Sequence, residues 1–553
     1  MKVAICCLNS KYIHSSLAPW CLLSGVKSFC KTSISADVLE STINCKNDIL
    51  IEKILNDNYD IVSFSCYIWN ITKTLEICKE IKEKTDLTII LGGPEVSYRA
   101  KDILENFPYI DYVLSGEGEE TFPELLDSIN NGIVYPYVDG LSYRKNNEII
   151  SLPERECSTT PPSPYTEEFF NSLNNRISYI ETSRGCPYRC AFCLSGRCSP
   201  LRFFDMEDVK ENIIKLSNSG TKTVKFVDRT FNASAKRANE ILRFIIENRG
   251  TKIPLNVCFH FEIAGDILKE ETFKILESAP KGLFQLEIGM QTFNEKTLEY
   301  INRKTDSEKL INNIKRLISF NNMHIHIDLI AGLPYEDMHS FEKSFNMGYN
   351  LNANMLQMGF LKLLHGAEMR ENTEKYPCEY SPDPPYEVKS TPWLSAKELE
   401  ELKKCEDALE RMYNSGRFIF TLDYLINKCS YTPFGLFMEI GKAINGNKMA
   451  LSEYAENLYE LFKNKVDSEL LREAIICDLL SCSSALQVPE ILKIKDPLLK
   501  KITKHFTDGQ SDKIKLAILY KTKKVFVVNQ SKNKDFTGRY PYKFYDLEIF
   551  DCL

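Results

Sequence analysis

Ile177-Ser-Tyr-Ile-Glu-Thr-Ser-Arg-Gly-Cys186-Pro-Tyr-Arg-Cys190-Ala-Phe-Cys193 places three cysteines directly after a short apolar run. The run Ile177–Glu181 is typical of a β-strand, and the C-x-x-x-C-x-x-C spacing puts three thiols on one tight loop. Three thiolates can bind three corners of a cubane iron–sulfur cluster and leave the fourth iron open to a small chelating molecule. A zinc site completed by Cys198 or a histidine is the alternative, although structural zinc more often uses paired C-x-x-C units.

Strand-like and helix-like segments alternate downstream of this loop as far as about residue 364. Six such βα units predict a partial or complete parallel barrel of the (βα)6 type, with the cysteine loop at its active rim. The predicted strands are Ile177–Glu181, Thr223–Val227, Leu255–Phe261, Leu283–Gly289, His324–Ala331 and Met355–Leu361.

A second α/β pattern precedes the cysteine loop and predicts a doubly wound, flavodoxin-like sheet. Ligands of such sheets bind outside the carboxyl ends of the strands, so the residues that follow each strand are the candidate site. Small and acidic residues gather there, in Ser65, Gly92-Gly93-Pro94-Glu95 and Gly116-Glu117-Gly118-Glu119. The predicted strands are Lys2–Leu8, Ser35–Leu39, Ile61–Ser65, Thr88–Leu91 and Tyr112–Leu114.

The remaining segments define the predicted domain boundaries. A hairpin with its turn at Asn146-Asn147 leads into a proline-rich linker containing Pro161, Pro162 and Pro164, and the chain beyond residue 385 is mainly helical with one late strand at Lys524–Val528. We therefore predict a front α/β domain over residues 1–135, a hairpin and linker over 136–170, the barrel over 171–370 and a mainly helical extension over 371–553.

Composition narrows the classes of protein. At 553 residues and 43% hydrophobic content the chain is a multidomain globular protein, and it has no apolar run near the roughly 20 residues of a bilayer span. Nineteen cysteines without an export signal predict a reducing, cytoplasmic location and argue against a disulfide framework. A net charge of −7 argues against nonspecific nucleic-acid binding, although the segment from Ile491 onward is locally basic.

The cysteine loop resembles that of the radical S-adenosylmethionine (SAM) enzymes, which share this spacing and an aromatic residue, here Phe192, before the last cysteine. The resemblance implies that Cys186, Cys190 and Cys193 hold a 4Fe-4S cluster and that SAM occupies its open iron. It also implies SAM contacts from strand ends at Phe192, Asp228, Glu262, Gln291 and Gly332. Asp228 stands where the commonest members carry Gly-Gly-Glu. A carboxylate such as Asp228 or Glu262 is also a common helix cap.

The front domain resembles the cobalamin-binding domain that precedes one large class of these enzymes. The resemblance implies cobalamin contacts from Ser65, Gly92, Gly93, Glu117 and Gly118. The D-x-H-x-x-G motif that supplies a cobalt-binding histidine elsewhere is absent, because Tyr12 and Leu17 replace its aspartate and glycine beside His14. We therefore expect a cobalamin without a histidine lower ligand.

The resemblance implies an oxygen-sensitive enzyme in which a 5′-deoxyadenosyl radical abstracts hydrogen from an unactivated carbon and methylcobalamin donates a methyl group. This is a radical C-methyltransferase, whose expected partners are a small-molecule or peptide substrate and an electron donor such as a flavodoxin or ferredoxin. Ring formation or rearrangement without methyl transfer is the alternative. A cobalamin-sensing regulator is a further alternative, which the intact cysteines disfavour. A nucleic-acid-modifying enzyme is another, which the absence of a recognisable RNA-binding motif disfavours.

Overall fold

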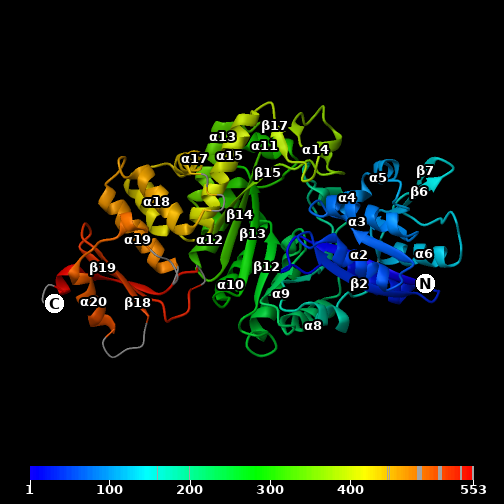
Figure 1. Ribbon diagram of the computed structural model, residues 1–553, viewed down its shortest axis with the longest axis horizontal. Coiled ribbons are helices and arrows are strands. Elements are labelled where there is room, and N and C mark those ends of the chain that lie inside the picture. Colours follow the sequence, from blue (N-terminus) through cyan, green and yellow to red (C-terminus); the bar gives the residue numbers. More distant parts are fainter. Residues whose placement is uncertain are drawn as a thin grey trace. The chain divides into compact units, whose positions relative to one another are not determined.

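The computed structural model describes residues 1–157, 160–197, 200–444, 446, 449–482, 488–507, 513–535 and 538–550 (Figure 1). Two compact units divide the chain. The first consists of Met1–Gly289, Leu298–Met323 and Phe360–Lys389, and the second of Met290–Thr297, His324–Gly359 and Ser390–Leu553. The domain boundaries given above remain predictions.

The first unit begins with a seven-stranded sheet of order β2-β1-β3-β4-β5-β6-β7, in which β1 to β5 are parallel and β6 and β7 antiparallel. This is the predicted doubly wound arrangement. Its strands are β1 (Lys2–Asn9), β2 (Ser35–Thr42), β3 (Ile61–Ser65), β4 (Thr88–Gly92), β5 (Tyr112–Leu114), β6 (Leu141–Lys145) and β7 (Glu148–Ser151). Its helices are α1 (Ala18–Phe29), α2 (Asn47–Asn56), α3 (Ile71–Lys84), α4 (Pro94–Ser97), α5 (Ala100–Asn106) and α6 (Gly118–Asn130).

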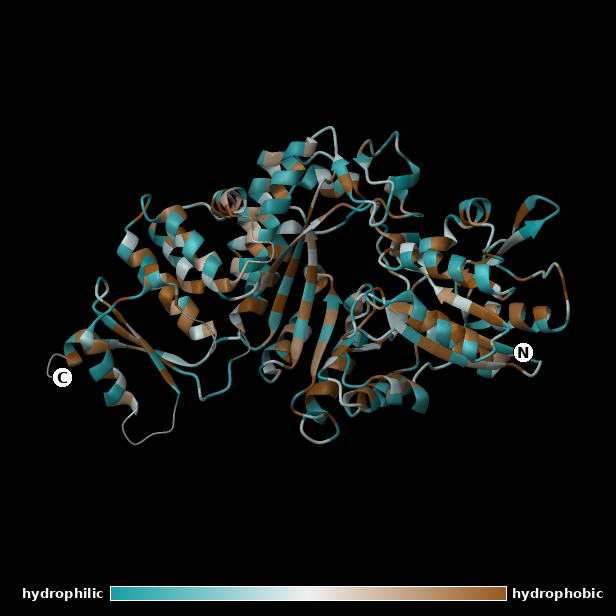
Figure 2. Ribbon diagram, viewed as in Figure 1, coloured by the Kyte–Doolittle hydropathy of each residue, from teal (hydrophilic) through white to brown (hydrophobic). Residues whose placement is uncertain are grey.

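Helices cover both faces of this sheet, which explains why its inner strands are continuous apolar runs (Figure 2). One face of β1 and β3, with Cys6 and Phe64, shares a core with Ile54 of α2 and Ile81 of α3. Helices α1 and α6 pack against each other. The close approach is visible at Gly25 of α1, where an added Cβ would lie 2.1 Å from the carbonyl oxygen of Glu119.

The predicted hairpin is formed by β6 and β7. Asn146 and Asn147 both have positive φ, at 50° and 65°, and two residues in this conformation make the tight turn whose twist matches that of the flanking strands. Asparagine tolerates this backbone better than other side chains, so the turn prediction is confirmed together with its physical reason.

A six-stranded parallel sheet of order β15-β14-β13-β12-β11-β8 forms the predicted partial barrel. Its strands are β8 (Ser178–Ile180), β11 (Thr223–Phe226), β12 (Cys258–Ile263), β13 (Phe284–Gln291), β14 (His324–Ala331) and β15 (Met355–Phe360). The helices along this part of the chain are α7 (Glu167–Ser172), α8 (Met206–Ser217), α9 (Ala235–Asn248), α10 (Glu270–Ser278), α11 (Glu295–Tyr300), α12 (Ser307–Ser319), α13 (Met338–Tyr349) and α14 (Glu368–Glu371).

Two details of the barrel differ from the prediction. The third strand begins at Cys258 and not at Leu255, because Leu255 is 68% exposed in the turn after Pro254. Two short ribbons were not predicted: β9 (Ser183–Arg184) pairs antiparallel with β10 (Arg202–Phe203), and β16 (Glu379–Tyr380) pairs with β17 (Val388–Ser390). The β9–β10 ribbon matters most, because it lies directly before Cys186.

The C-terminal part of the second unit is mainly helical, as predicted. Its α-helices are α15 (Ala396–Leu409), α16 (Ile419–Asp423), α17 (Pro433–Ala443), α18 (Leu451–Phe462), α19 (Ser468–Cys482) and α20 (Pro497–Thr507), with π-helical turns at Glu410–Asn414 and Tyr424–Lys428. The predicted late strand is the centre of a three-stranded antiparallel sheet, formed by β18 (Ile514–Leu519), β19 (Lys524–Asn529) and β20 (Tyr542–Asp546).

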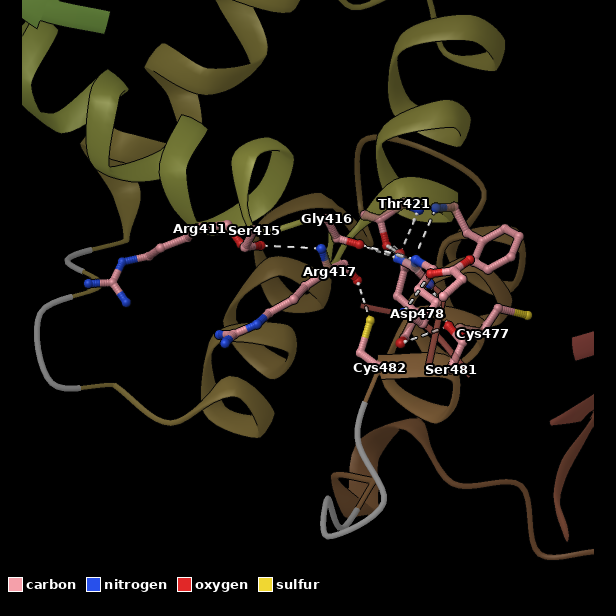
Figure 3. Close-up of polar contacts among 12 residues, drawn as sticks. Arg411, Ser415, Gly416, Arg417, Thr421, Cys477, Asp478, Ser481 and Cys482 are labelled. Atoms are coloured by element: carbon pink, nitrogen blue, oxygen red, sulfur yellow. Dashed lines mark hydrogen bonds and ion pairs between the residues drawn. The ribbon is translucent and has the colours of Figure 1, made fainter. Parts of the chain in front are cut away.

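A buried ion pair fixes the end of the chain to these helices (Figure 3). Arg539 precedes β20, and its guanidinium donates to Asp478 of α19 at 2.8 Å and to the carbonyl oxygen of Gly416. Asp478 also accepts hydrogen bonds from the backbone N–H groups of Phe420 and Thr421. The rings of Phe420 and Tyr542 also pack edge to face, with their centroids 5.4 Å apart. Across the described residues, every helix is too short or too polar to cross a bilayer.

Candidate functional site

A cavity of about 600 Å³ lies in the first unit, where the carboxyl ends of strands from both sheets face each other. The seven-stranded sheet contributes residues after β1, β3, β4 and β5, and the barrel contributes residues after β8 and β11. Of the predicted cobalamin contacts, Ser65, Gly92, Gly93, Glu117 and Gly118 all line this cavity. The structure therefore brings Ser65 and Gly118, which lie far apart in sequence, to the lining of the same cavity.

The glycines of this wall are required by close backbone approaches. Gly93 has φ of 101°, and a Cβ there would lie 2.6 Å from the carbonyl oxygen of Cys66. A side chain at Gly118 would meet Leu22 at 2.6 Å. Ser65 is 5% exposed and ends β3. Larger residues at Gly93 and Gly118 would therefore clash with their neighbours, and the backbone stays accessible at these strand ends.

The loop after β3 adds an aromatic surface that the sequence analysis did not single out. Tyr67 and Trp69 stack with their ring centroids 4.5 Å apart and their planes 4° from parallel, and both line the cavity. Asn70 fixes this loop, because its side chain accepts from the backbone N–H of Tyr67 and donates to the carbonyl oxygens of Leu8 and Ser65.

His14 lines the same cavity, and its ring is already engaged. Its Nδ1 lies 2.7 Å from the hydroxyl oxygen of Tyr179, and burial lowers its pKa below the ordinary value. The backbone at His14 also bridges to Ile177, which leads into β8. These contacts join the loop after β1 to the residues around β8, and the expectation of a cobalamin without a histidine lower ligand stays a prediction.

The three cysteines of the loop after β9 are free thiols. Cys190 is buried, and its sulfur accepts a hydrogen bond from Nη1 of Arg303 at 3.7 Å. The Sγ of Cys186 lies 3.5 Å from the hydroxyl oxygen of Thr230. Three free thiols on one loop are the ligands that an iron–sulfur cluster needs, and hydrogen bonds to the sulfurs tune its reduction potential, so these residues fit the cluster. Phe192 is half-buried on the same loop, and Cys198 lies outside the described residues.

Asp228 follows β11 and accepts hydrogen bonds from Thr182 and Ser183, which precede the cysteines. Its carboxylate accepts from the backbone N–H of Thr182 at 3.1 Å, from the Thr182 hydroxyl at 2.7 Å and from the Ser183 hydroxyl. Burial raises the pKa of Asp228, and these donors oppose that rise. Asp228 lies after β11, as predicted. Its carboxylate oxygens accept hydrogen bonds from Thr182 and Ser183 of the same chain.

The other predicted SAM contacts lie on three further strands. Glu262 belongs to β12, and burial, followed by the charge of Glu287, raises its pKa. In the second unit, Gln291 ends β13 with φ of 69°, and Gly332 follows β14 with φ of 90°. Both are buried. Each residue therefore stands at or near the carboxyl end of its strand, where a barrel holds its ligands.

Arg184 joins the cysteine loop to the cavity wall, and the sequence analysis did not identify it. Its guanidinium donates to Glu117 at 2.6 Å, to Glu119 at 2.5 Å and to Glu181 at 2.9 Å. Arg202, its neighbour across the β9–β10 ribbon, also donates to Glu117. Burial alone would lower the pKa of Arg184, but Glu181 and Glu119 raise it above its ordinary value.

Comparison with known families accounts for most of the chain. Residues 24–126 match the B12 binding domain, and residues 180–348 match the radical SAM superfamily. Residues 374–537 match a protein of unknown function, DUF4080. The chain belongs to the cobalamin-dependent radical SAM family. Its radical SAM domain takes a 4Fe-4S cluster and SAM as cofactors, and its B12 binding domain takes cobalamin.

Two curated relatives illustrate the reactions of similar proteins. This family member is 26% identical over 436 residues to the cobalamin-dependent radical SAM methyltransferase TokK of Streptomyces tokunonensis, covering 74% of this chain and 62% of that one. It is 24% identical over 340 residues to the anaerobic magnesium-protoporphyrin IX monomethyl ester cyclase of Rubrivivax gelatinosus, covering 57% of this chain and 58% of that one. The chain spans roughly three fifths of the length of these two relatives.

Among solved structures, the cobalamin-dependent SAM radical enzyme OxsB with aqua-cobalamin and SAM bound has a similar fold. The TM-score is 0.59 at 16% identity, over 86% of this chain and 78% of OxsB. At this identity the likeness concerns the fold alone. The predicted architecture of the family member, a front α/β sheet followed by a six-stranded parallel barrel and a helix-rich extension, is confirmed.

Proposed function

We propose that the chain is a cobalamin-dependent radical SAM C-methyltransferase that acts on an unactivated carbon of a small-molecule or peptide substrate, in a reducing, anaerobic cytoplasm. One observation carries the proposal: the cavity beside the glycine-rich strand ends is also lined by Glu181 and Arg184, which lie just before the cluster cysteines. When bound, the cofactors supply a hydrogen-abstracting radical from SAM and a methyl group from cobalamin.

The chain's own residues bind and orient these groups. In this proposal Cys186, Cys190 and Cys193 hold the cluster, and Arg303 stabilises the negative charge on the Cys190 sulfur. Ser65, Gly92 and Gly93 line the cobalamin face of the cavity. The remaining proposed contacts, to SAM, are Phe192, Asp228, Glu262, Gln291 and Gly332. Electrons come from a reduced partner such as a flavodoxin or ferredoxin.

Cyclisation without methyl transfer is the second candidate, because a cyclase is among the similar proteins. The two reactions differ in what SAM becomes. A methyltransferase would convert SAM into both S-adenosylhomocysteine and 5′-deoxyadenosine. A cyclase of this class has no need to form S-adenosylhomocysteine.

The test needs no substrate. The holoenzyme, reconstituted anaerobically with iron, sulfide and hydroxocobalamin, is reduced chemically and given SAM with a deuterated methyl group. Labelled methylcobalamin and an equal amount of S-adenosylhomocysteine are expected. Deuterium-free cobalamin accompanied only by 5′-deoxyadenosine would favour the cyclase. A chain that retains iron but no cobalt would contradict both candidates.

A further inference from the structure

Arg184 is the only described residue between β8 and Cys186 whose side chain pairs with carboxylates of the front sheet. Its side chain is 15% exposed, and that of Glu119 is 8% exposed. Ion pairs at 2.5 to 2.6 Å in such surroundings are screened far less by solvent than pairs at the surface. The contact therefore persists at ionic strengths that weaken surface ion pairs, and it joins the cysteine loop to the start of α6.

The residues on both sides of the Arg184 ion pairs are held in place by neighbouring structure. On one side, Glu117 is the N-cap of α6 and Glu119 lies in its first turn, where α1 packs so closely that Gly25 has no room for a side chain. On the other side, Asp228 holds Thr182 and Ser183 through three hydrogen bonds. Only Gly185 separates Arg184 from Cys186. A movement of the cavity wall at Glu117 is thus passed to the first cluster cysteine.

We propose that Arg184 is a positioning residue that couples occupancy of the cavity to the geometry of the cluster loop. The inference rests on the proposed cobalamin site, whose wall contains Glu117 and Glu119. A ligand that seats against this wall fixes the carboxylates, the carboxylates fix Arg184, and Arg184 fixes the loop that carries Cys186. By thermodynamic reciprocity, an assembled cluster then tightens binding in the cavity by the same factor.

The coupling is measured as a ratio of affinities. Hydroxocobalamin is titrated anaerobically into the full chain with and without its reconstituted cluster, and binding is followed by the optical spectrum. We expect the parent to bind about tenfold more tightly when the cluster is present, within the usual range of coupling between sites. In Arg184→Gln the affinities with and without the cluster should become equal, whatever the absolute affinity of the variant.

Arg155 provides a matched control. Its guanidinium also meets three carboxylates, Glu120, Glu124 and Asp139, but none of them belongs to the cysteine loop. Arg155→Gln should keep the parental ratio. Arg184→Lys should restore little, because one ammonium cannot reproduce the planar fork that spans Glu117 and Glu119. An unchanged ratio in Arg184→Gln, or an equal loss in Arg155→Gln, would overturn the proposal.

A second measurement requires no cofactor. Hydrogen–deuterium exchange of the peptide 182–193 in the apo-protein should be faster in Arg184→Gln than in the parent or in Arg155→Gln. If Arg184→Gln does not fold, Glu117→Gln replaces it in the exchange measurement, where the retained pair with Glu119 should make the increase in exchange smaller than in Arg184→Gln. Absence of cobalamin binding in the parent would contradict the proposed function. Unchanged exchange would contradict the role of Arg184.

Discussion

The guanidinium of Arg539 lies 2.8 Å from the carboxylate of Asp478, and both side chains are almost wholly excluded from solvent. Asp478 receives two backbone N–H groups and the hydroxyl of Thr421 in addition, so that each of its oxygens has two donors (Figure 3). The pair ties the segment before β20 to helix α19. The pair has a structural role, because the buried polar groups of Arg539 and Asp478 find their hydrogen-bond partners within the protein.

Removing one member of this pair should destabilise the second unit strongly. Arg539→Met leaves a buried carboxylate without its counter-charge, and we expect a loss of about 3–5 kcal/mol in the free energy of unfolding. Urea unfolding followed by circular dichroism measures it. Arg417→Met is the control, because this exposed side chain follows Gly416, whose carbonyl oxygen Arg539 contacts, and its loss should change stability by less than about 0.5 kcal/mol. Equal effects of the two substitutions would contradict the assignment.

Glu336 should make the second unit less stable as the pH rises. It is completely buried, and burial raises its pKa to about 7 despite hydrogen bonds from Thr292 and Ser344. An acid whose pKa is higher in the folded state contributes its full stability below the unfolded pKa and loses it as the pH rises through the folded pKa. The loss between pH 4.5 and 7 is on the order of 3 kcal/mol.

Glu336→Gln should remove this pH dependence, because the amide keeps an acceptor for Thr292 without ever taking a charge. Thermal unfolding of the parent and of Glu336→Gln is compared at about pH 5 and pH 8. The difference between the two proteins should be larger at the higher pH, in favour of the variant. A difference that stays constant with pH would show that Glu336 does not titrate in this range.

Asp228 should act first on the cluster loop. Asp228→Asn weakens the hydrogen bonds to Thr182 and Ser183, and we expect a lower iron content after reconstitution together with faster exchange of the loop. The double substitution Thr182→Val with Ser183→Ala removes the same bonds from the other side. If both proteins lose iron alike, Asp228 works through the loop. If only Asp228→Asn loses affinity for SAM, with iron unchanged, the direct contact implied by the family resemblance is favoured.

Gly92→Val should reduce cobalamin binding by about tenfold or more. Gly92 lines the cavity, and an added Cβ would meet only the carbonyl oxygen of Leu114, at 3.3 Å. The valine methyl groups would therefore take up cavity space that bound cobalamin needs. Overfilling a site that the ligand packs closely costs about 1–3 kcal/mol. Gly359→Ala is the control, since Gly359 has no positive φ, does not line the cavity, and its added Cβ would make only a van der Waals contact of 3.5 Å with the carbonyl oxygen of Leu329. The readout is cobalt bound per chain after gel filtration, and undiminished cobalt in Gly92→Val would place the ligand elsewhere.

Arg303→Gln should make the reduction potential of the cluster more negative. Arg303 donates to the Cys190 sulfur and to the carbonyl oxygen of Gly289. A positively charged donor stabilises the more negative, reduced cluster, and its loss makes reduction harder. A redox titration followed by electron paramagnetic resonance measures the midpoint. A midpoint that does not fall would exclude an electrostatic role for Arg303.

The sequence predicted best the elements whose burial is uniform. Strands β1, β3 and β4 are enclosed on both faces, so their continuous apolar runs left little choice of structure. Strand β20 was missed because Tyr542 and Phe544 are exposed and alternate with charged residues, which gives no core-facing pattern. Strand β12 was placed too early because Leu255 is apolar but lies in a turn.

The candidate site divides in the same way. The spacing of the cysteines was enough to single out Cys186, Cys190 and Cys193. Position after a predicted strand singled out Ser65, Gly92 and Gly93. Arg184 gave no local signal, because its partners are 65 and 67 residues earlier in the chain and long-range ion pairs leave no periodicity. The alternation Gly116-Glu117-Gly118-Glu119 was visible in the sequence, but only the structure shows that its two carboxylates pair with Arg184.

The distance along the chain between these partners sets an order of events during synthesis. The ribosome releases Glu117 and Glu119 well before Arg184, and N-terminal domains generally fold first. The nascent cysteine loop therefore emerges beside a surface that already carries two carboxylates. We expect the loop to be captured by that surface before β13, β14 and β15 are made, so that the front sheet acts as a template on which the cluster site is assembled.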